Sequence, residues 1–449
     1  MGRENVAVVG NGYVGTVVAA CFASLGRTVV GVESDESKLT MLQRGRAPFY
    51  EPGLDDLLQE ELTTGRLRFT NDLRSALAES EIVFLCVGTP SVADGRADMG
   101  ALEVAAREIG RADERHHILV TKSTVPIGSS NWLAEIVRSA TEGRDGRRSL
   151  SVVSNPEFLR EGNAINDFLH PERIVLGGDD EALAAVADLY RPILEQSFNG
   201  TDSRRRPPLI KTDLVTAETI KYACNTFLAT KVSFINEIAN ICDLVGAEVT
   251  DVATSMGLDP RIGSQFLSAG VGWGGSCFGK DLDALVATAE DLGYDAQLLK
   301  ATDAVNDRQR DVIIRKLQRE LGTLRGQRIG ILGLAFKPET DDLRDAPSVQ
   351  VTSRLFSMGA FVRAHDPIVE HVPGLPELRT HATAYEVAKE ADALVLMTEW
   401  PEFLDLDLQK LKENMRGRLF VDARNAFDPA LVTEVGFRYV GVGRRGSTV

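Results

Sequence analysis

Cysteine is scarce in this sequence, with only five among 449 residues, and no two of them are spaced as Cys-x-x-Cys. Small secreted domains are stapled by closely spaced, even-numbered cysteines, and structural zinc sites need clustered Cys and His. The five cysteines are odd in number and scattered: Cys21, Cys86, Cys224, Cys242 and Cys277. This argues against a disulfide framework and against a metal site, so any cysteine chemistry would use a free thiol.

An excess of positive charge is also missing. The chain has 50 Lys and Arg against 65 Asp and Glu, which gives a formal net charge of −15. Non-specific nucleic-acid binding depends on a basic surface that neutralises phosphates, so no nucleic-acid partner is expected. An anionic small ligand would need a local cluster of Arg and Lys.

Long apolar runs are absent as well. No uninterrupted stretch approaches the roughly 18 residues that span a bilayer. The first residues, MGRENVAVVGNG, lead straight into a strand-like pattern and not into a signal peptide. We therefore expect a cytoplasmic protein with no membrane partner. With 43% hydrophobic and 26% charged residues, the composition is that of a globular protein, and its length predicts two to four domains of roughly 100–200 residues.

The first motif present is a glycine turn between a strand and a helix. Residues 6–9 have the pattern of a buried strand, residues 10–15 read GNGYVG, and a helical stretch follows. A second strand, 28–32, ends at the acidic residue Glu33. This arrangement is typical of a dinucleotide site, in which the helix N-terminus holds a pyrophosphate and the acidic residue binds a ribose. Glu33 favours NAD over NADP; the alternative is a purely structural glycine turn.

Two further strands, 82–87 and 118–120, each run into a small polar loop, 88–90 and 123–126. Ligands of open parallel sheets lie beyond the carboxyl ends of the strands, so we expect both loops to face the cofactor. Cys86 lies inside the first of these strands, where its expected role is core filling.

The middle of the chain changes period. Between residues 214 and 245, apolar residues recur at steps of three and four, which predicts a long amphipathic helix. The residues of this pattern are Ile220, Ala223, Phe227, Phe234, Ile238, Ile241 and Val245. A helix of this length extends about 45 Å, which favours a spine between two lobes and a dimer surface.

The C-terminal third repeats the strand and helix order of the N-terminal third without a full GxGxxG, with strands at 328–333, 361–366 and 393–397. The predicted fold class is α/β, with two Rossmann-like doubly wound domains joined by a central helical domain that contains the long spine helix. The expected domain ranges are 1–203, 204–305 and 306–449.

Residues 270–281, GVGWGGSCFGKD, place one cysteine in a glycine-rich segment. Glycine costs conformational entropy but lets backbone approach a ligand closely. The Cys277 thiolate could form a thiohemiacetal with an aldehyde, and hydride loss would turn this adduct into a thioester that water can hydrolyse. The alternative is an inert buried cysteine, which the dense glycines and the nearby Lys280 and Asp281 make less favourable.

Three further side chains could take part in chemistry. Lys221 and Asn225 lie four residues apart on the predicted long helix and so share a face, where Lys could act as an acid or base and Asn could donate to an oxyanion. Glu157 follows a strand, 150–153, and could face the same crevice. The alternatives are a solvated helix face for the first two residues and a simple first-turn carboxylate after Pro156 for the third.

With these pieces in chain order, the sequence resembles the UDP-glucose/GDP-mannose dehydrogenase family from about Val6 to about Pro429. The motifs that carry the resemblance are GNGYVG, VGTP, KSTVP, SNPEFLREG, IKYACNTFLA, DPRIGSQFLSAGVGWGGSCFGKD, GLAFKPETDDLRDAP and VDARN. The resemblance implies an oxidoreductase that converts the C6 hydroxymethyl of a nucleotide sugar, here UDP-glucose, into a carboxylate with two NAD and no free aldehyde. It also implies a homodimer.

The resemblance implies roles residue by residue. Cys277 is similar to the family's nucleophile, Lys221 to the lysine that steadies charge on the substrate oxygen with Asn225 beside it, and Glu157 to the acid/base of thioester hydrolysis. Asp281 with Thr124 resembles the network that positions the hydrolytic water. Matching cofactor contacts are Gly10, Gly12, Tyr13, Val14, Gly15, Glu33, Lys38, Thr89, Thr124, Glu161 and Arg344. Matching substrate contacts are Glu157, Phe158, Leu159, Lys221, Asn225, Arg261, Phe266, Gly274, Phe336, Lys337 and Arg424, with Arg261 contributed across the dimer.

Two positions depart from the family pattern. Gly279 stands where many relatives have proline, which should loosen the loop, and Ser268 stands where some have lysine, which leaves substrate identity open. The alternatives are therefore a GDP-mannose or UDP-N-acetylhexosamine 6-dehydrogenase, a single-step hydroxyacid-type dehydrogenase in which Cys277 is structural, and a non-enzymatic nucleotide-binding module. Assaying each sugar nucleotide for NADH production separates the nucleotide-sugar dehydrogenases from one another, and two NADH per sugar would exclude the single-step dehydrogenase.

Overall fold

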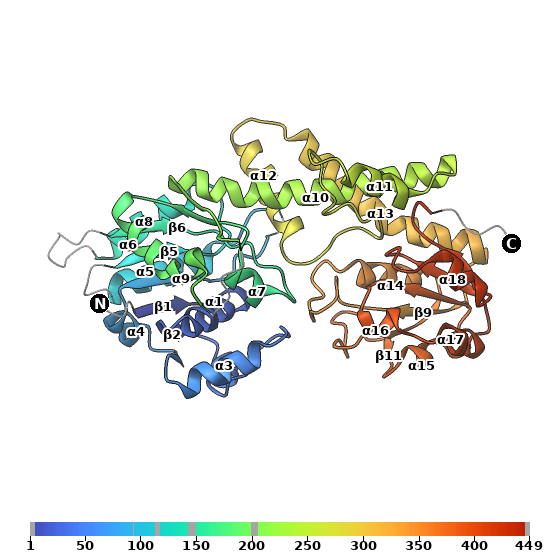
Figure 1. Cartoon of the computed structure of the whole chain (residues 1–449), viewed down its shortest axis with the longest axis horizontal. Coiled ribbons are helices and arrows are strands. Elements are labelled where there is room, and N and C mark those ends of the chain that lie inside the picture. Colours follow the sequence, from blue (N-terminus) through green and yellow to red (C-terminus); the bar gives the residue numbers. More distant parts are fainter. Residues whose placement is uncertain (1–4, 93, 113–116, 142–149, 199–204, 445–449) are drawn as a thin grey trace. The chain divides into compact units, whose positions relative to one another are not determined.

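Two sheets built mainly of parallel strands organise the chain in this computed structural model (Figure 1). The structure describes residues 5–92, 94–112, 117–141, 150–198 and 205–444. Contacts divide the chain into two compact units, residues 1–224 with 283–292 and residues 225–282 with 293–449. The helices α10 (Leu214–Val245) and α12 (Phe278–Asp291) each contribute to both units. The fold class predicted from the sequence is confirmed.

The first unit contains an eight-stranded sheet in the order β3-β2-β1-β4-β5-β6-β7-β8. Its strands pair in parallel, except that β7 pairs antiparallel with β6. The strands are β1 (Asn5–Val9), β2 (Thr28–Val32), β3 (Leu67–Thr70), β4 (Ile82–Leu85), β5 (Ile118–Thr121), β6 (Ser151–Ser154), β7 (Ile174–Gly177) and β8 (Leu209–Thr212). The helices are α1 (Tyr13–Ser24), α2 (Glu36–Gln43), α3 (Leu54–Thr63), α4 (Leu73–Glu79), α5 (Gly100–Ala112), α6 (Ser129–Thr141), α7 (Ala164–Leu169), α8 (Asp180–Leu189) and α9 (Arg191–Glu195).

Both faces of this sheet are covered, which is why its central strands are apolar on both sides. In β1, Val6 and Val8 belong to a core with α1, α3 and α8, while Ala7 and Val9 belong to a core with α4, α5 and α6. Alternate side chains of a strand point to opposite faces, so one short apolar run serves both cores. The carboxyl ends of β1, β4 and β5 therefore meet at one edge of the sheet.

The second unit contains a six-stranded parallel sheet in the order β11-β10-β9-β12-β13-β14. Its strands are β9 (Arg328–Leu332), β10 (Phe361–His365), β11 (Arg379–Thr380), β12 (Ala393–Leu396), β13 (Leu419–Asp422) and β14 (Arg438–Val440). Its further helices are α11 (Val249–Gly257), α13 (Gln297–Leu321), α14 (Pro347–Ser357), α15 (Ala384–Ala388), α16 (Pro401–Leu404), α17 (Leu408–Asn414) and α18 (Pro429–Glu434).

The long helix α10 has the predicted bounds, and much of its predicted apolar pattern is exposed in the single chain. Phe227, Phe234 and Ile241, which belong to the apolar pattern, are exposed at 64%, 46% and 49% in the single chain. Within the described residues of the single chain, no neighbouring element covers Phe227, which the sequence assigned to the apolar pattern. The buried side chains of α10 include several polar ones: Glu218, Lys221, Asn225, Thr226, Ser233 and Asn236.

Two further predictions from the sequence concern a domain boundary and membrane-spanning helices. The expected boundary between residues 203 and 204 lies outside the described residues. Among the helices that the structure describes, none is long and apolar enough to cross a bilayer.

Candidate active site

The glycine turn between β1 and α1 has the geometry that the sequence predicts. Gly10 has a φ of 87°, and a Cβ on Gly15 would lie 1.9 Å from the carbonyl oxygen of Gly10, so no larger residue fits at Gly15. A Cβ on Gly12, by contrast, would meet no described atom within 4 Å, and no side chain caps the N-terminus of α1 there. The first N–H groups of α1 are thus available to an anion at the positive end of the helix dipole.

Glu33 lies directly beside this turn, immediately after β2. Its carboxylate accepts hydrogen bonds from the backbone N–H of Asn11 (3.0 Å) and of Asp35 (2.9 Å). Each carboxylate oxygen has two acceptor sites, so ribose hydroxyls can still be accommodated. Lys38, another predicted cofactor contact, lies on the exposed face of α2. The turn and Glu33 therefore fit a dinucleotide.

The loops after β4 and β5 also come together at this edge. The hydroxyl of Thr89 donates to the backbone carbonyl of Thr124 (2.7 Å). Cys86, which directly follows β4, is buried in the core that contains α1, and burial raises the pKa of its thiol to about 12, which agrees with a core-filling role. The two polar loops therefore face one another, as parallel strand ends predict.

Glu51 is a residue of this region that sequence reasoning missed. Its buried carboxylate accepts hydrogen bonds from the hydroxyl of Tyr13 in the glycine turn and from the backbone N–H of Gly162 (2.7 Å) and Ala164 (2.8 Å). It thereby ties the turn to the segment that contains Glu157 and Glu161. Its only signal in the sequence was a carboxylate beside a proline and a glycine, which is not specific.

Glu157 and Lys221 form a buried ion pair in the first unit. The ammonium of Lys221 lies 2.7 Å from Oε1 of Glu157, and the backbone N–H of Leu159 donates to Oε2 at 2.7 Å. Burial by itself would raise the pKa of Glu157, but the Lys221 ammonium and this N–H hold it below its ordinary value. A charged carboxylate is thus kept next to a charged amine.

Phe158 lies against the same pair. The guanidinium carbon of Arg173 stands 3.9 Å from the centre of its ring, and the Lys221 ammonium stands 5.5 Å from it. Arg173 also donates to the sulfur of Cys224 at 3.1 Å. Sequence reasoning missed Arg173, because an arginine before a strand is an ordinary surface pattern.

Cys277 immediately precedes α12, with its side chain half-buried. The backbone N–H of Asp281 donates to the Cys277 carbonyl at 2.9 Å, which closes the first turn of the helix. The thiol therefore lies at the amino end of α12, the end whose dipole favours negative charge. This location suits a nucleophilic thiolate.

Asp281 is almost fully buried and has two polar partners in the second unit. Asn225 donates to its Oδ2 at 2.6 Å, and the ammonium of Lys280 lies 2.8 Å from its Oδ1. The helix α10 thus supplies both predicted residues, Lys221 to Glu157 and Asn225 to Asp281. The sequence predicted the shared helix but not these two acidic partners.

Two glycines of residues 270–277, Gly270 and Gly274, pack closely against the protein's own backbone. A Cβ on Gly270 would lie 2.6 Å from the carbonyl oxygen of Ala423, and one on Gly274 would lie 2.3 Å from that of Asp345. Trp273 is buried and donates through Nε1 to the Ser233 hydroxyl at 3.0 Å. The segment is therefore tightly packed against the rest of the second unit.

Three predicted substrate contacts of the second unit follow strands of its parallel sheet: Phe336, Lys337 and Arg424. Arg424 follows β13 and donates to the carbonyls of Met397 (2.7 Å) and Phe336 (2.8 Å). The ammonium of Lys337 stands 5.5 Å from the centre of the Phe336 ring. These residues lie after the carboxyl ends of β9, β12 and β13, the edge where open parallel sheets bind ligands.

Three other predicted ligand contacts interact with residues that are near to them in the sequence. Arg344 and Arg261 pair with the neighbouring Asp342 and Asp259, and Arg261 is 87% exposed in its side chain. Phe266 has a φ of 63° and lies near Phe278, with ring centres 6.2 Å apart.

Comparison with known proteins agrees with this arrangement. Residues 4–194 match the NAD binding domain of the UDP-glucose/GDP-mannose dehydrogenase family, residues 215–308 its central domain and residues 330–429 its UDP binding domain. These domains and the site define an NAD-dependent oxidoreductase. The chain belongs to the UDP-glucose/GDP-mannose dehydrogenase family.

Three relatives illustrate the similarity. The chain is 47% identical to UDP-glucose 6-dehydrogenase of Rhizobium meliloti, over 98% of this chain and 99% of the relative. Its fold matches that of a UDP-glucose dehydrogenase from Pyrobaculum islandicum with a TM-score of 0.89 and 37% identity, over 99% of this chain and 98% of that one. A UDP-D-ManNAc dehydrogenase from Pyrococcus horikoshii matches with a TM-score of 0.84 and 28% identity, over 98% of this chain and 99% of that one.

Proposed function

We propose that this chain catalyses the NAD-dependent oxidation of UDP-glucose to UDP-glucuronate through a covalent adduct on Cys277. The observation that carries the proposal is that α10 presents Lys221 to a buried glutamate and Asn225 to a buried aspartate, with Cys277 at the start of the helix that holds that aspartate. A single-step dehydrogenase would not need this second acidic group beside a thiol. The higher identity to UDP-glucose relatives supports the choice of sugar.

The cofactor site in this proposal consists of the glycine turn and the residues around it. Bound NAD would accept a hydride from the sugar C6 carbon, once for each of two oxidations. The proposed cofactor contacts are Gly10, Gly12, Tyr13, Val14, Gly15, Glu33, Lys38, Thr89, Thr124, Glu161 and Arg344.

The covalent step belongs to Cys277. Its thiolate adds to the C6 aldehyde carbon, and the carbonyl oxygen takes up a proton to give a thiohemiacetal. The Lys221 ammonium and the Asn225 amide would donate to the substrate oxygen as its charge develops. The second oxidation leaves a thioester on the same sulfur, so no aldehyde is released.

Water then cleaves the thioester. The oxygen of water forms a bond to C6, the C6–S bond breaks, and the sugar leaves as a carboxylate while the thiol is restored. Glu157 would exchange the proton, and Asp281 with Thr124 would orient the water. The proposed substrate contacts are Glu157, Phe158, Leu159, Lys221, Asn225, Arg261, Phe266, Gly274, Phe336, Lys337 and Arg424.

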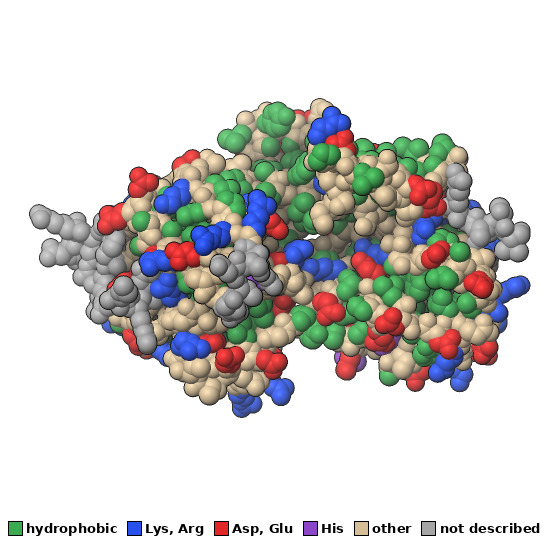
Figure 2. All heavy atoms as spheres, viewed as in Figure 1, with side chains coloured by type: hydrophobic (Ala, Val, Ile, Leu, Met, Phe, Trp, Pro, Cys, Tyr) green, Lys and Arg blue, Asp and Glu red, His purple; other side chains and the backbone are tan. Residues whose placement is uncertain are grey.

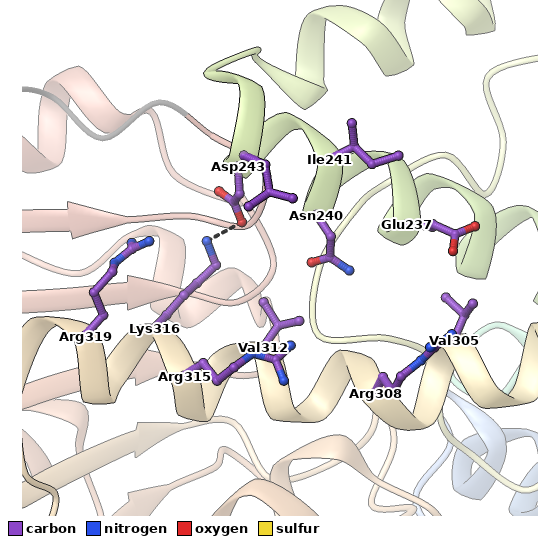
Figure 3. A pocket seen from close by; sticks show the side chains of 11 residues that line it. Glu237, Asn240, Ile241, Asp243, Val305, Arg308, Val312, Arg315, Lys316 and Arg319 are labelled. Atoms are coloured by element: carbon purple, nitrogen blue, oxygen red, sulfur yellow. Dashed lines mark hydrogen bonds and ion pairs between the residues drawn. The ribbon is translucent and has the colours of Figure 1, made fainter.

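A homodimer is the second part of the proposal, with its interface on α10. Leu244 and Val245 at the end of this helix are 87% and 70% exposed, and hydrophobic side chains are visible there at the surface (upper right of Figure 2). A groove of about 610 Å³ lies between α10 and α13, and Figure 3 shows the ion pair between Lys316 of α13 and Asp243 of α10. Exposed apolar side chains such as Leu244 and Ile241 beside a groove lined by charged residues support an interface at this place. Arg261 would reach the second copy's site.

The same proposal covers domain ranges and location. We assign residues 1–203 to NAD binding, 204–305 to the central helical domain and 306–449 to UDP-sugar binding. A cytoplasmic location is supported by the need for a reduced catalytic thiol and for the intracellular NAD pool.

Stoichiometry tests the central claim. The purified protein should form two NADH per UDP-glucose consumed, and UDP-glucuronate should be the product by mass spectrometry. UDP-N-acetylmannosamine and GDP-mannose, run in parallel, should give much lower turnover. One NADH per sugar would contradict the four-electron reaction, and faster turnover of another sugar would contradict the substrate.

A further inference from the structure

Lys122 is a fully buried lysine that the proposed reaction does not use. It follows β5 immediately, and its side chain is 5% exposed. Its ammonium donates to Oδ1 of Asn155 at 3.0 Å and to the hydroxyl of Tyr190 at 3.3 Å. An ammonium in such a place is costly unless something stabilises its charge.

The hydrogen-bond partners of Lys122 are neutral. Asn155 is an amide, and burial raises the pKa of the Tyr190 hydroxyl well above its ordinary value, so it stays protonated. The nearby Cys86 is also held as a thiol by burial. Neither partner supplies a negative charge to offset the ammonium.

The carboxylate whose negative charge stabilises the Lys122 ammonium is that of Glu157. Among the described residues, the charged groups that act on Lys122 are Glu157, which favours its ammonium, and Lys221, which opposes it. Burial dominates and lowers the pKa of Lys122 to about 8, so that it is still mainly charged at neutral pH. The Lys122 ammonium in turn helps to keep the pKa of Glu157 below its ordinary value.

Asn155 joins Lys122 to the glutamate through the backbone, because it lies two residues before Glu157. Its side chain accepts hydrogen bonds from Lys122 and from the Tyr190 hydroxyl (2.6 Å), and it donates to the carbonyl of Val175 at 2.9 Å. Its own N–H donates to the Thr121 carbonyl at 2.9 Å. Asn155 directly follows β6 and is hydrogen-bonded to β5 through Thr121 and to β7 through Val175, so the short segment from Asn155 to Glu157 is anchored on three strands.

We propose that Lys122 is a positioning residue, whose buried ammonium holds the Asn155 turn and, together with Lys221, keeps Glu157 ionised for the hydrolytic step. Lys221 binds the Glu157 carboxylate directly. Lys122, at the end of β5, acts on it through its charge and through its hydrogen bond to Asn155. The inference rests on the proposed role of Glu157. In this proposal, Lys122 is a second cation that acts on Glu157 through its charge and through Asn155, and it does not bind the sugar.

The test compares the pH dependence of turnover in Lys122→Met and in the wild-type chain. Removal of a neighbouring positive charge raises the pKa of a carboxylic acid, so the acidic limb of the kcat profile should move up by about one pH unit, a tenfold loss of turnover on that limb. KM for NAD should change by less than about twofold. Lys122→Gln also removes the charge but keeps a hydrogen-bond donor for Asn155, and gives the same readout should the methionine variant fail to fold.

Two control variants separate charge from packing. Tyr190→Phe removes one hydrogen bond of Lys122 but leaves the charge, so its acidic limb should stay in place. Lys316→Met removes another buried lysine, which pairs with Asp243 outside the site, so it should lower stability without any shift of the profile.

The outcomes distinguish the inference from the proposed function. If Glu157→Gln turns over like the wild type, the role of Glu157 is wrong. If Glu157→Gln is inactive but Lys122→Met and Lys122→Gln keep the wild-type profile, the function stands and the inference is overturned. An equal shift in Tyr190→Phe would likewise overturn the role of charge.

Discussion

The ammonium of Lys221 lies 2.7 Å from Oε1 of Glu157, and both side chains are more than nine-tenths buried. They come from positions 64 residues apart, one on the long helix α10 and one after strand β6. Removal of one partner of such a pair leaves an uncompensated buried charge. This relationship makes stability and turnover testable with the same variants.

Lys221→Met should destabilise the protein by about 3–5 kcal/mol at pH 7, because Glu157 loses its main counter-charge. The double variant Lys221→Met/Glu157→Gln should recover part of this loss. Urea unfolding followed by circular dichroism measures both. A single variant as stable as the wild type would contradict the buried pair.

The pair should also shape the pH dependence of stability. The pKa of Glu157 is lowered in the folded state, so its contribution is complete above the unfolded-state value of about 4.3 and is lost as the pH falls through the folded-state value. The stability difference between the wild type and Glu157→Gln should therefore shrink below about pH 4. Unfolding curves from pH 7 to pH 3 test this, and a difference that grows on acidification would contradict the sign.

Cys277→Ala should reduce formation of the carboxylate product by at least about 1,000-fold, as expected for loss of a covalent nucleophile. NAD affinity should be unchanged, because the glycine turn and Glu33 are untouched. Product analysis and a calorimetric titration with NAD measure the two effects. Cys242→Ala, at a buried cysteine outside the site, is the matched control. Normal turnover of Cys277→Ala would exclude the covalent mechanism.

Glu33→Ala should weaken NAD binding by about tenfold, because one or two hydrogen bonds to the ribose are lost. Glu36→Ala, in the exposed first turn of α2, serves as the control. Equal NAD affinity in Glu33→Ala and in the wild type would show that another acidic residue binds the ribose.

Gly279→Ala should stabilise the protein by about 0.5–1 kcal/mol and keep activity. Gly279 lies in the first turn of α12, and a Cβ there would come no closer than 3.6 Å to Trp273. Gly275→Ala should instead destabilise, because Gly275 has a φ of 86° and its Cβ would lie 2.7 Å from the Phe336 ring. Thermal melts compare the two, and the opposite order would contradict the geometry.

The exposed face of α10 leads to a prediction about assembly. Leu244→Glu combined with Phe234→Glu should shift a dimer toward monomer in analytical ultracentrifugation, because charges would be buried in the interface. Leu431→Glu changes an apolar residue on α18 that is 58% exposed, between Phe234 (46%) and Leu244 (87%), and should leave assembly unchanged. A wild-type chain that sediments as a monomer would contradict the dimer.

Much of the fold could be predicted from local patterns. Short apolar runs that lead into small polar loops predicted β1, β4 and β5. The GNGYVG turn between a strand and a helix predicted the dinucleotide site, because the contact that excludes a larger residue at Gly15 is with Gly10, five residues away. The length of α10 followed from period alone. The positions of Lys221, Asn225, Glu157 and Cys277 were candidates for the same reason, since each lies in a short motif.

Only the tertiary structure decided which face of α10 is buried and which partners its polar groups meet. Period in a sequence reports that a helix is amphipathic, but burial depends on segments that are remote in the chain, such as Glu157 and Asp281. Lys221 and Asn225 face these carboxylates on the buried side of α10, which also contains Tyr222 and Ile235, while Phe227 and Ile241 lie at the surface of the single chain. The sequence did not single out Lys122 for the same reason, because its hydrogen-bond partners Asn155 and Tyr190 are brought to it only by the folded sheet.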